Sequence, residues 1–134
     1  MMRPAIPIPG GYRALAFAAV AAIALQLLVL PEPAFAERII EATWDKAVHA
    51  SVFGGVAFLL WAGLAGRGAV LVALLVVLLG ALDETHQMFV PGRDPDLHDV
   101  YADGMGAAAV LMFLQAVTAP RVATDPRASL ISGD

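Results

Sequence analysis

Residues 69–119 read AVLVALLVVLLGALDETHQMFVPGRDPDLHDVYADGMGAAAVLMFLQAVTA, which is an apolar run, a polar segment and a second apolar run. The polar segment, residues 83–103, holds half of the chain's twelve acidic residues and two of its three histidines. Ionisable groups beside apolar runs of this kind usually mark a functional site in a membrane protein. The pattern therefore predicts a bundle of membrane helices with its chemistry concentrated at one end.

The composition agrees with a membrane setting. The chain has 134 residues, of which 60% are hydrophobic and 15% are charged, and its mean hydropathy is +0.77. Soluble domains have roughly 45–50% apolar and about 25% charged residues. The absence of cysteine excludes disulfides, thiolate metal sites and a cysteine nucleophile. The acid excess, together with the outward location expected below for the polar segment, disfavours binding to nucleic acid.

We expect an all-α integral membrane bundle with four transmembrane helices in a single domain covering residues 1–134. The expected spans are residues 14–30, 47–65, 67–90 and 97–119, because a helix needs about 20 residues to cross a hydrocarbon core of roughly 30 Å. The third and fourth spans reach that length only by including part of the polar segment. Residues 35–45 are expected to form an amphipathic helix in the headgroup layer, the alternative being a solvated loop, and the tail, residues 120–134, is expected to be disordered.

The positions of lysine and arginine predict the orientation in a bacterial inner membrane. Five basic residues fall on one side of the four spans, and three fall on the other together with ten of the twelve acids. Basic residues favour the cytoplasm, so both termini are expected there, with the polar segment outside. An open alternative is a signal peptide, because Ala34-Phe35-Ala36 matches a cleavage pattern. Cleavage would leave three helices in the same orientation.

Small residues predict which helices pack closely. The second span carries small residues four apart at Ala47, Ser51 and Gly55, with Ala50 and Gly54 one register away. The fourth span adds Ala102 with Gly106 and Gly104 with Ala108. Small residues at this spacing let two helix backbones approach each other in lipid. The second and fourth spans are therefore the expected close pair.

The second span opens with Asp45, Lys46 and His49. Asp45 and His49 share a helix face, and His49 lies about 6 Å deeper by the helical rise. An acid in the first turn also complements the helix dipole, which gives Asp45 a structural explanation. A histidine inside a span needs a polar partner, so we interpret His49 as part of a functional network.

The third span carries acids at its C-terminal end, where they oppose the helix dipole. Asp83, Glu84 and Gln87 fall within one arc of that helix and are expected to face a polar partner or water. Beyond the Pro91-Gly92 turn, Asp96 is the predicted N-cap of the fourth span and Asp99 its N3 acid. The candidate ligand-binding residues are Asp45, Lys46, His49, Glu84, Gln87, Arg93, Asp99 and Asp103.

Four polar blocks in this order resemble the VanZ-like family of small bacterial membrane proteins. They are D-K-x-x-H at residues 45–49, D-E-x-H-Q at residues 83–87, P-G-R at residues 91–93 and D-x-x-x-D-x-x-G at residues 99–106. The family's namesake is linked to low-level resistance to the glycopeptide teicoplanin. One departure is that the family usually has Asn where this chain has Asp103.

Two function classes follow from these residues. The first is a cell-envelope membrane protein whose outward polar site holds a lipid-linked ligand bearing a phosphate or a glycan, and which affects susceptibility to glycopeptide antibiotics. Here Arg93 and Lys46 would bind the anion, and the acids with His49 would hold a sugar or move protons. The alternative is a membrane-embedded hydrolase or transferase that acts on an envelope lipid precursor with a divalent metal. A proton or ion path is a third interpretation, which the apolar middle of the spans disfavours.

Overall fold

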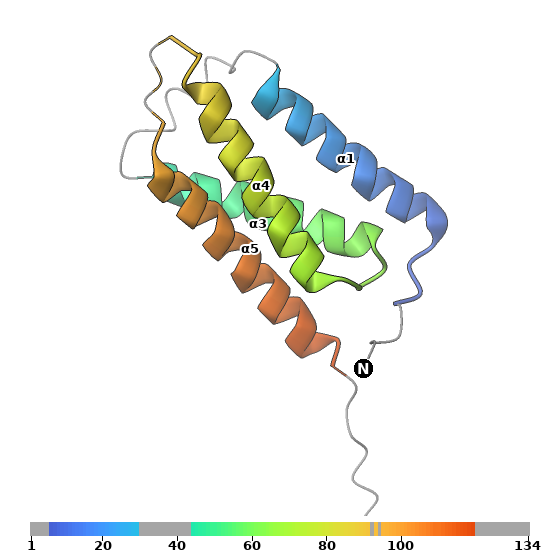
Figure 1. The fold of residues 1–134 in the computed structure, drawn as a ribbon. Coiled ribbons are helices and arrows are strands. Elements are labelled where there is room, and N and C mark those ends of the chain that lie inside the picture. The colour runs from blue at the N-terminus through green and yellow to red at the C-terminus, as the bar shows by residue number, and fades with distance from the viewer. Residues whose placement is uncertain (1–5, 30–43, 92, 94, 120–134) are drawn as a thin grey trace, which may run out of the picture.

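The computed structural model is a bundle of helices and describes residues 6–29, 44–91, 93 and 95–119 (Figure 1). Within these residues it contains α1 (Gly10–Leu28), α3 (Asp45–Gly63), α4 (Ala69–Gln87) and α5 (Leu97–Val117). Each of the four is long and apolar enough to cross a membrane. The prediction of an all-α bundle with four transmembrane helices is confirmed, and the chain is a multi-pass membrane protein. The amphipathic helix expected over residues 35–45 lies mostly outside the described residues, and the tail, residues 120–134, lies wholly outside them.

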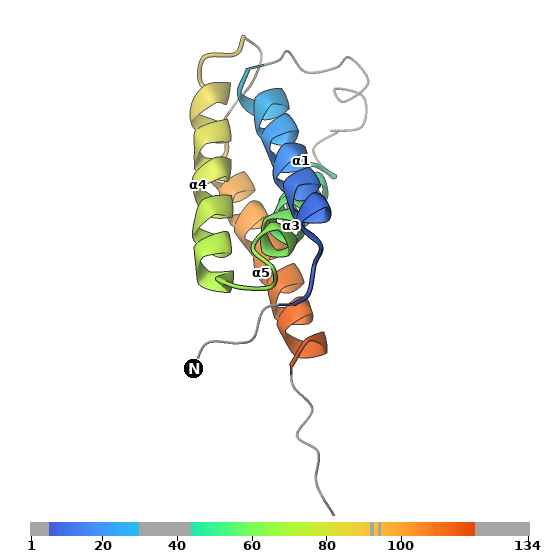
Figure 2. The ribbon, with the colours of Figure 1, turned by 90° about the vertical axis from the view of Figure 1, so that its right-hand side faces the viewer.

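α3 is the centre of the bundle. It packs against each of the other three helices, and α4 packs against both α1 and α5. Figure 1 shows α3 running behind α4, and the side view in Figure 2 shows α1 lying over α3. The starts of α3 and α5 lie side by side, where Lys46 of α3 bonds to Asp99 of α5.

The helix ends follow from local chemistry. α3 and α4 are joined by a tight turn in which Gly66 and Gly68 have φ of +76° and +68°, values that glycine adopts without steric cost. α4 continues past Leu82 but ends at Gln87, earlier than the expected Val90. The residue before a proline is disfavoured in a helix, and Pro91 follows Val90, so the chain leaves the helix before this point.

The predicted close pair of the second and fourth spans is confirmed in α3 and α5. The contact uses the register of Ala50 and Gly54, whereas Ala47, Ser51 and Gly55 are exposed. A Cβ atom on Gly106 would overlap the carbonyl oxygen of Ala50, and a Cβ atom on Gly54 would lie 3.3 Å from the carbonyl oxygen of Gly106. Only a residue without a side chain fits at Gly106, and a Cβ atom on Gly54 would require its neighbours to shift slightly. The two backbones are thereby held close together directly below the polar end.

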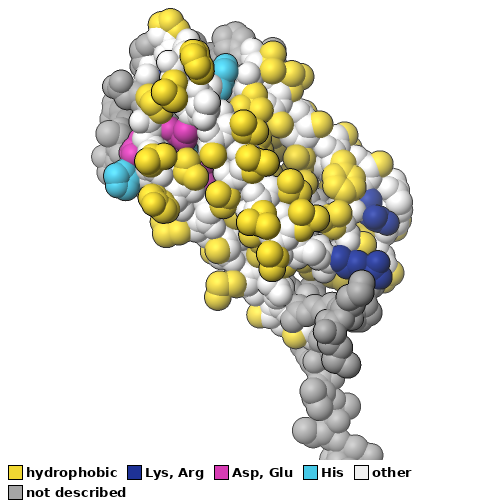
Figure 3. All heavy atoms as spheres, viewed as in Figure 1, with side chains coloured by type: hydrophobic (Ala, Val, Ile, Leu, Met, Phe, Trp, Pro, Cys, Tyr) yellow, Lys and Arg dark blue, Asp and Glu magenta, His cyan; other side chains and the backbone are white. Residues whose placement is uncertain are grey.

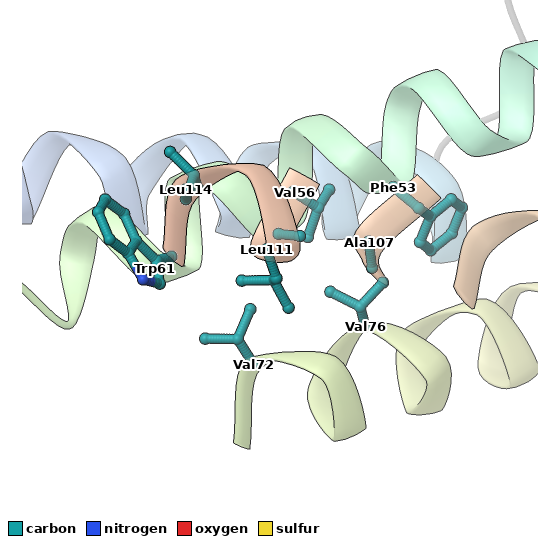
Figure 4. Packing of buried hydrophobic residues seen from close by; sticks show 9 residues of the cluster. Phe53, Val56, Trp61, Val72, Val76, Ala107, Leu111 and Leu114 are labelled. Atoms are coloured by element: carbon teal, nitrogen blue, oxygen red, sulfur yellow. The ribbon is translucent and has the colours of Figure 1, made fainter. Parts of the chain in front are cut away.

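The middle of the bundle is a packed apolar core. Figure 4 shows side chains of three helices pointing toward one another, namely Phe53, Val56 and Trp61 of α3, Val72 and Val76 of α4, and Ala107, Leu111 and Leu114 of α5. The outer surface is also apolar: Leu74, Leu78 and Phe113 are each more than half exposed. A soluble monomer rarely exposes so much apolar surface, whereas lipid tails cover it without cost.

The charged side chains are sorted to the two ends. Figure 3 shows acidic and histidine side chains at one end of the molecule and arginine or lysine side chains at the other, with apolar side chains between. At the basic end, Arg13 Nε donates to the Gly63 carbonyl at 2.8 Å and ties α1 to the end of α3. The opposite end carries the candidate site.

Candidate functional site

Lys46 joins α3 to the start of α5. Its Nζ donates to Asp99 Oδ1 at 2.5 Å and to Asp96 Oδ2 at 2.8 Å. Asp96 is also the N-cap of α5, where its Oδ1 accepts the His98 backbone N–H at 2.9 Å, as predicted. The hydrogen bond from Lys46, followed by those from His98, holds the pKa of the Asp96 carboxyl well below its usual range. Lys46 therefore remains paired with the Asp96 carboxylate at any physiological pH.

His49 lies one turn deeper and binds Asp103. Its Nδ1 is 3.0 Å from Asp103 Oδ1, and Asp103 is fully buried. The other oxygen of Asp103, Oδ2, has no hydrogen-bond partner among the described residues. It points at Gly80 of α4, where a Cβ atom would overlap it. Gly80 thus provides the space that the Asp103 carboxylate occupies between α4 and α5.

The second nitrogen of His49 faces two further carboxylates. His49 Nε2 lies 3.8 Å from Asp45 Oδ1 and 3.9 Å from Asp99 Oδ2. The side chains of Asp99 and His49 are 7% and 11% exposed, and that of Asp45 is 24% exposed at the mouth of the site. One imidazole and two carboxylates are therefore gathered from α3 and α5 into one half-open space.

α4 adds a third group of polar side chains to the site, beside those of α3 and α5. Asp83, Glu84 and Gln87 are all buried. The Gln87 side-chain amide donates to Asp83 Oδ2 at 3.2 Å and to Glu84 Oε1 at 3.3 Å. Glu84 Oε2 accepts the backbone N–H of Asp96 at 2.7 Å. Glu84 therefore takes the place of the N3 acid in the expected capping arrangement, while Asp99 binds Lys46 instead.

An apolar pocket adjoins this cluster. It has a volume of about 340 Å³ and is lined by Ala81, Glu84, Thr85, Met88, Pro95, Leu97 and Val100. Glu84 belongs both to the pocket wall and to the polar cluster. The end of the bundle thus presents polar and apolar binding surface side by side.

The structure brings together Asp45, Lys46, His49, Glu84, Gln87, Asp99 and Asp103 from three helices. It places Arg93 in the loop between α4 and α5, partly buried, with its backbone N–H donating to the Val90 carbonyl at 3.2 Å. Sequence reasoning gave Asp96 only a capping role, whereas the structure adds its bond to Lys46. It did not single out Gly80, because no local pattern indicates which glycine faces a buried carboxylate.

A family profile described as VanZ/LLP1 matches residues 12–118, which is most of the chain. The chain belongs to the VanZ/LLP1 family. Comparison with curated proteins and with solved structures gives no match. The VanZ/LLP1 assignment confirms the resemblance drawn from the four polar blocks and makes this a VanZ-like envelope protein. The D-K-x-x-H, D-E-x-H-Q and D-x-x-x-D blocks of this VanZ/LLP1 chain lie on the three helices that build the polar cluster.

Proposed function

We propose that this protein binds a lipid-linked ligand with a phosphate- or glycan-bearing headgroup at the outer face of the bacterial inner membrane. The observation that carries the proposal is the position of the apolar pocket against the polar cluster, with Glu84 in both. An amphiphile needs this combination, since its chain and its headgroup require surfaces of opposite character. The pocket would take the start of the chain and the cluster the headgroup.

The headgroup chemistry follows from the side chains around the mouth. Lys46 is 46% exposed, and Asp96 and Asp99 hold its ammonium in position. An anion bound there would share the charge of Lys46 with these two acids. Arg93, in the adjoining loop, would bind a phosphate through its planar guanidinium. Carboxylates such as Glu84 and Asp45 would accept hydrogen bonds from sugar hydroxyls.

The outward location rests on the sorting of charge. Arg13 lies at the opposite end of the bundle from the cluster, and basic residues favour the cytoplasmic side. A ligand reached from outside would be an envelope precursor or its lipid carrier. Binding it would change how glycopeptide antibiotics meet their target, which is the source of the expected susceptibility phenotype.

The proposal is tested by binding of an isoprenoid-phosphate lipid, with and without an attached sugar, to the protein in nanodiscs of defined phospholipids. Glu84→Ala and Arg93→Ala are expected to lose most of the binding. Arg93→Lys is also expected to bind weakly, because an ammonium does not reproduce the planar fork.

Ser51→Ala is the matched control. Ser51 lies on α3 beside the site, but its hydroxyl donates to the Ala47 carbonyl of its own helix. Its loss should leave binding unchanged. Equal binding by wild type, Glu84→Ala and Arg93→Ala would refute the proposal, as would a loss that follows only the amount of folded protein.

A further inference from the structure

The spacing around His49 Nε2 differs from that of a hydrogen-bonded cluster. Its distances to Asp45 Oδ1 and Asp99 Oδ2 are 3.8 and 3.9 Å, whereas N–H···O bonds are about 2.7–3.2 Å long. Two ligand atoms that each lie about 2.1 Å from one metal ion are themselves roughly 3 to 4 Å apart. One ligand atom from each of Asp45, His49 and Asp99 lies within 4.8 Å of the others. His49 Nε2 is thus separated from each carboxylate oxygen as two ligands of a shared ion are, and the two carboxylates lie on the same side of the ring nitrogen.

The other ring nitrogen of His49, Nδ1, also has the hydrogen-bond partner that is usual for a metal-binding histidine. Histidines that bind a metal through one ring nitrogen usually donate the other N–H to a carboxylate, which fixes the ring and increases its basicity. Asp103 Oδ1, at 3.0 Å from Nδ1, is such an acceptor. With Nδ1 donating, Nε2 carries its lone pair toward Asp45 and Asp99.

Asp103 supplies a separate indication that a cation belongs here. Its side chain is 1% exposed, its Oδ1 is directed onto His49, and its Oδ2 faces Gly80 without a hydrogen-bond partner among the described residues. A buried carboxylate with one unmet oxygen costs free energy unless positive charge lies nearby. The charge of Lys46 is already divided between Asp96 and Asp99.

We infer that Asp45, His49 and Asp99 bind a divalent transition-metal ion, with Asp103 as the outer partner of His49. Zn²⁺ and Mn²⁺ fit a ligand set of one imidazole nitrogen and two carboxylate oxygens better than Mg²⁺ or Ca²⁺, which prefer oxygen alone. The ion enters from the headgroup side, where Asp45 is partly exposed.

Three protein ligands leave at least one coordination position open. A phosphate oxygen of the lipid headgroup would occupy that position, and this one step rests on the function proposed above. Binding of the ion itself does not depend on it. The ion would then connect the protein's acids to an anionic ligand that they would otherwise repel.

The test is isothermal titration of Zn²⁺ and of Mn²⁺ into the full chain, purified without a polyhistidine tag, treated with a chelator and held in detergent without added lipid. The wild type is expected to bind one ion per chain. Asp103→Asn should weaken binding by roughly 10–100-fold, the usual cost of losing an outer partner. His49→Ala and Asp45→Asn remove direct ligands and should weaken it further.

His98→Ala is the matched control, because His98 also pairs with an acid at this end but is 76% exposed and lies outside the ligand set. It should bind the ion as the wild type does. Absence of binding by the wild type, unchanged affinity in both His49→Ala and Asp45→Asn, or loss in His98→Ala alone would overturn the inference. If His49→Ala does not fold, Asp45→Asn decides, since Asp45 is partly exposed in the first helical turn.

The two proposals fail in different ways. Metal binding without lipid binding would refute the proposed ligand and keep the ion site. Lipid binding that is unchanged by chelation, in a protein that takes up no ion, would refute the ion site and keep the ligand.

Discussion

Gly80 makes room for a single carboxylate, and this gives a prediction at the scale of one residue. A Cβ atom added there would overlap Asp103 Oδ2. Gly80→Ala should therefore displace Asp103 from His49 and lower the free energy of unfolding by about 1–3 kcal/mol, as overpacking does elsewhere. Thermal unfolding in detergent measures this change.

Gly55→Ala is the control for that substitution. Gly55 is also within a helix, but a Cβ atom there meets nothing within 4 Å. This variant should be neutral or more stable by about 0.5–1 kcal/mol, because alanine favours the helix. Equal effects of the two substitutions would show that Gly80 does not hold space for Asp103.

The sequence predicts which residues form the site better than it predicts which of them contact one another. Asp45 and His49 are four apart on one helix, so their shared face follows from spacing alone. The pairing of His49 with Asp103 and of Lys46 with Asp99 depends on how α3 and α5 are rotated against each other. That rotation is set by the close crossing at Ala50 and Gly106, which no single helix encodes.

At the scale of the elements, the crossing of α3 and α5 is the most sensitive contact. Gly106→Ala should force the helices apart because its Cβ atom would overlap the Ala50 carbonyl oxygen. We expect a loss of about 1–3 kcal/mol in the free energy of unfolding and weaker binding at the site above. Thermal unfolding and the ion titration measure the two effects.

Gly104→Ala tests the same helix half a turn away. Its Cβ atom would lie 3.6 Å from Val77 Cγ2, an ordinary van der Waals distance. It should leave both unfolding and ion binding close to wild type. If Gly104→Ala and Gly106→Ala behave alike, helix propensity rather than the crossing sets the stability.

Helix boundaries were predictable where a local signal exists. The Asp96 cap is predicted correctly because a capping side chain acts on the backbone of its own helix. The end of α4 at Gln87 was placed too late, since hydropathy through Val90 continues past the point where the helix stops. Hydropathy reports the lipid boundary, whereas backbone hydrogen bonding decides the helix end.

For the whole molecule, composition was sufficient to predict the bundle but not its arrangement. Apolar side chains cover both its core and its outer surface, which is why hydropathy identifies four spans yet does not distinguish α3 as the central helix. The two ends differ sharply in charge, and that difference is readable from sequence because each charge must leave the hydrocarbon layer.

This separation of charge predicts the topology of the molecule in the membrane. Arg13 and Arg67 belong to the basic end, while Lys46 and Asp96 belong to the end that carries the site. Because positive residues are retained in the cytoplasm, reporter fusions after Gly68 and after Pro120 should report the cytoplasm, and fusions at Asp94 the outside. An alkaline phosphatase and a fluorescent protein, active on opposite sides, give complementary readings at each position. A cytoplasmic signal at Asp94 would show that the orientation is the reverse of the predicted one. The polar cluster would then face the cytoplasm, and the argument for an external envelope ligand would be lost.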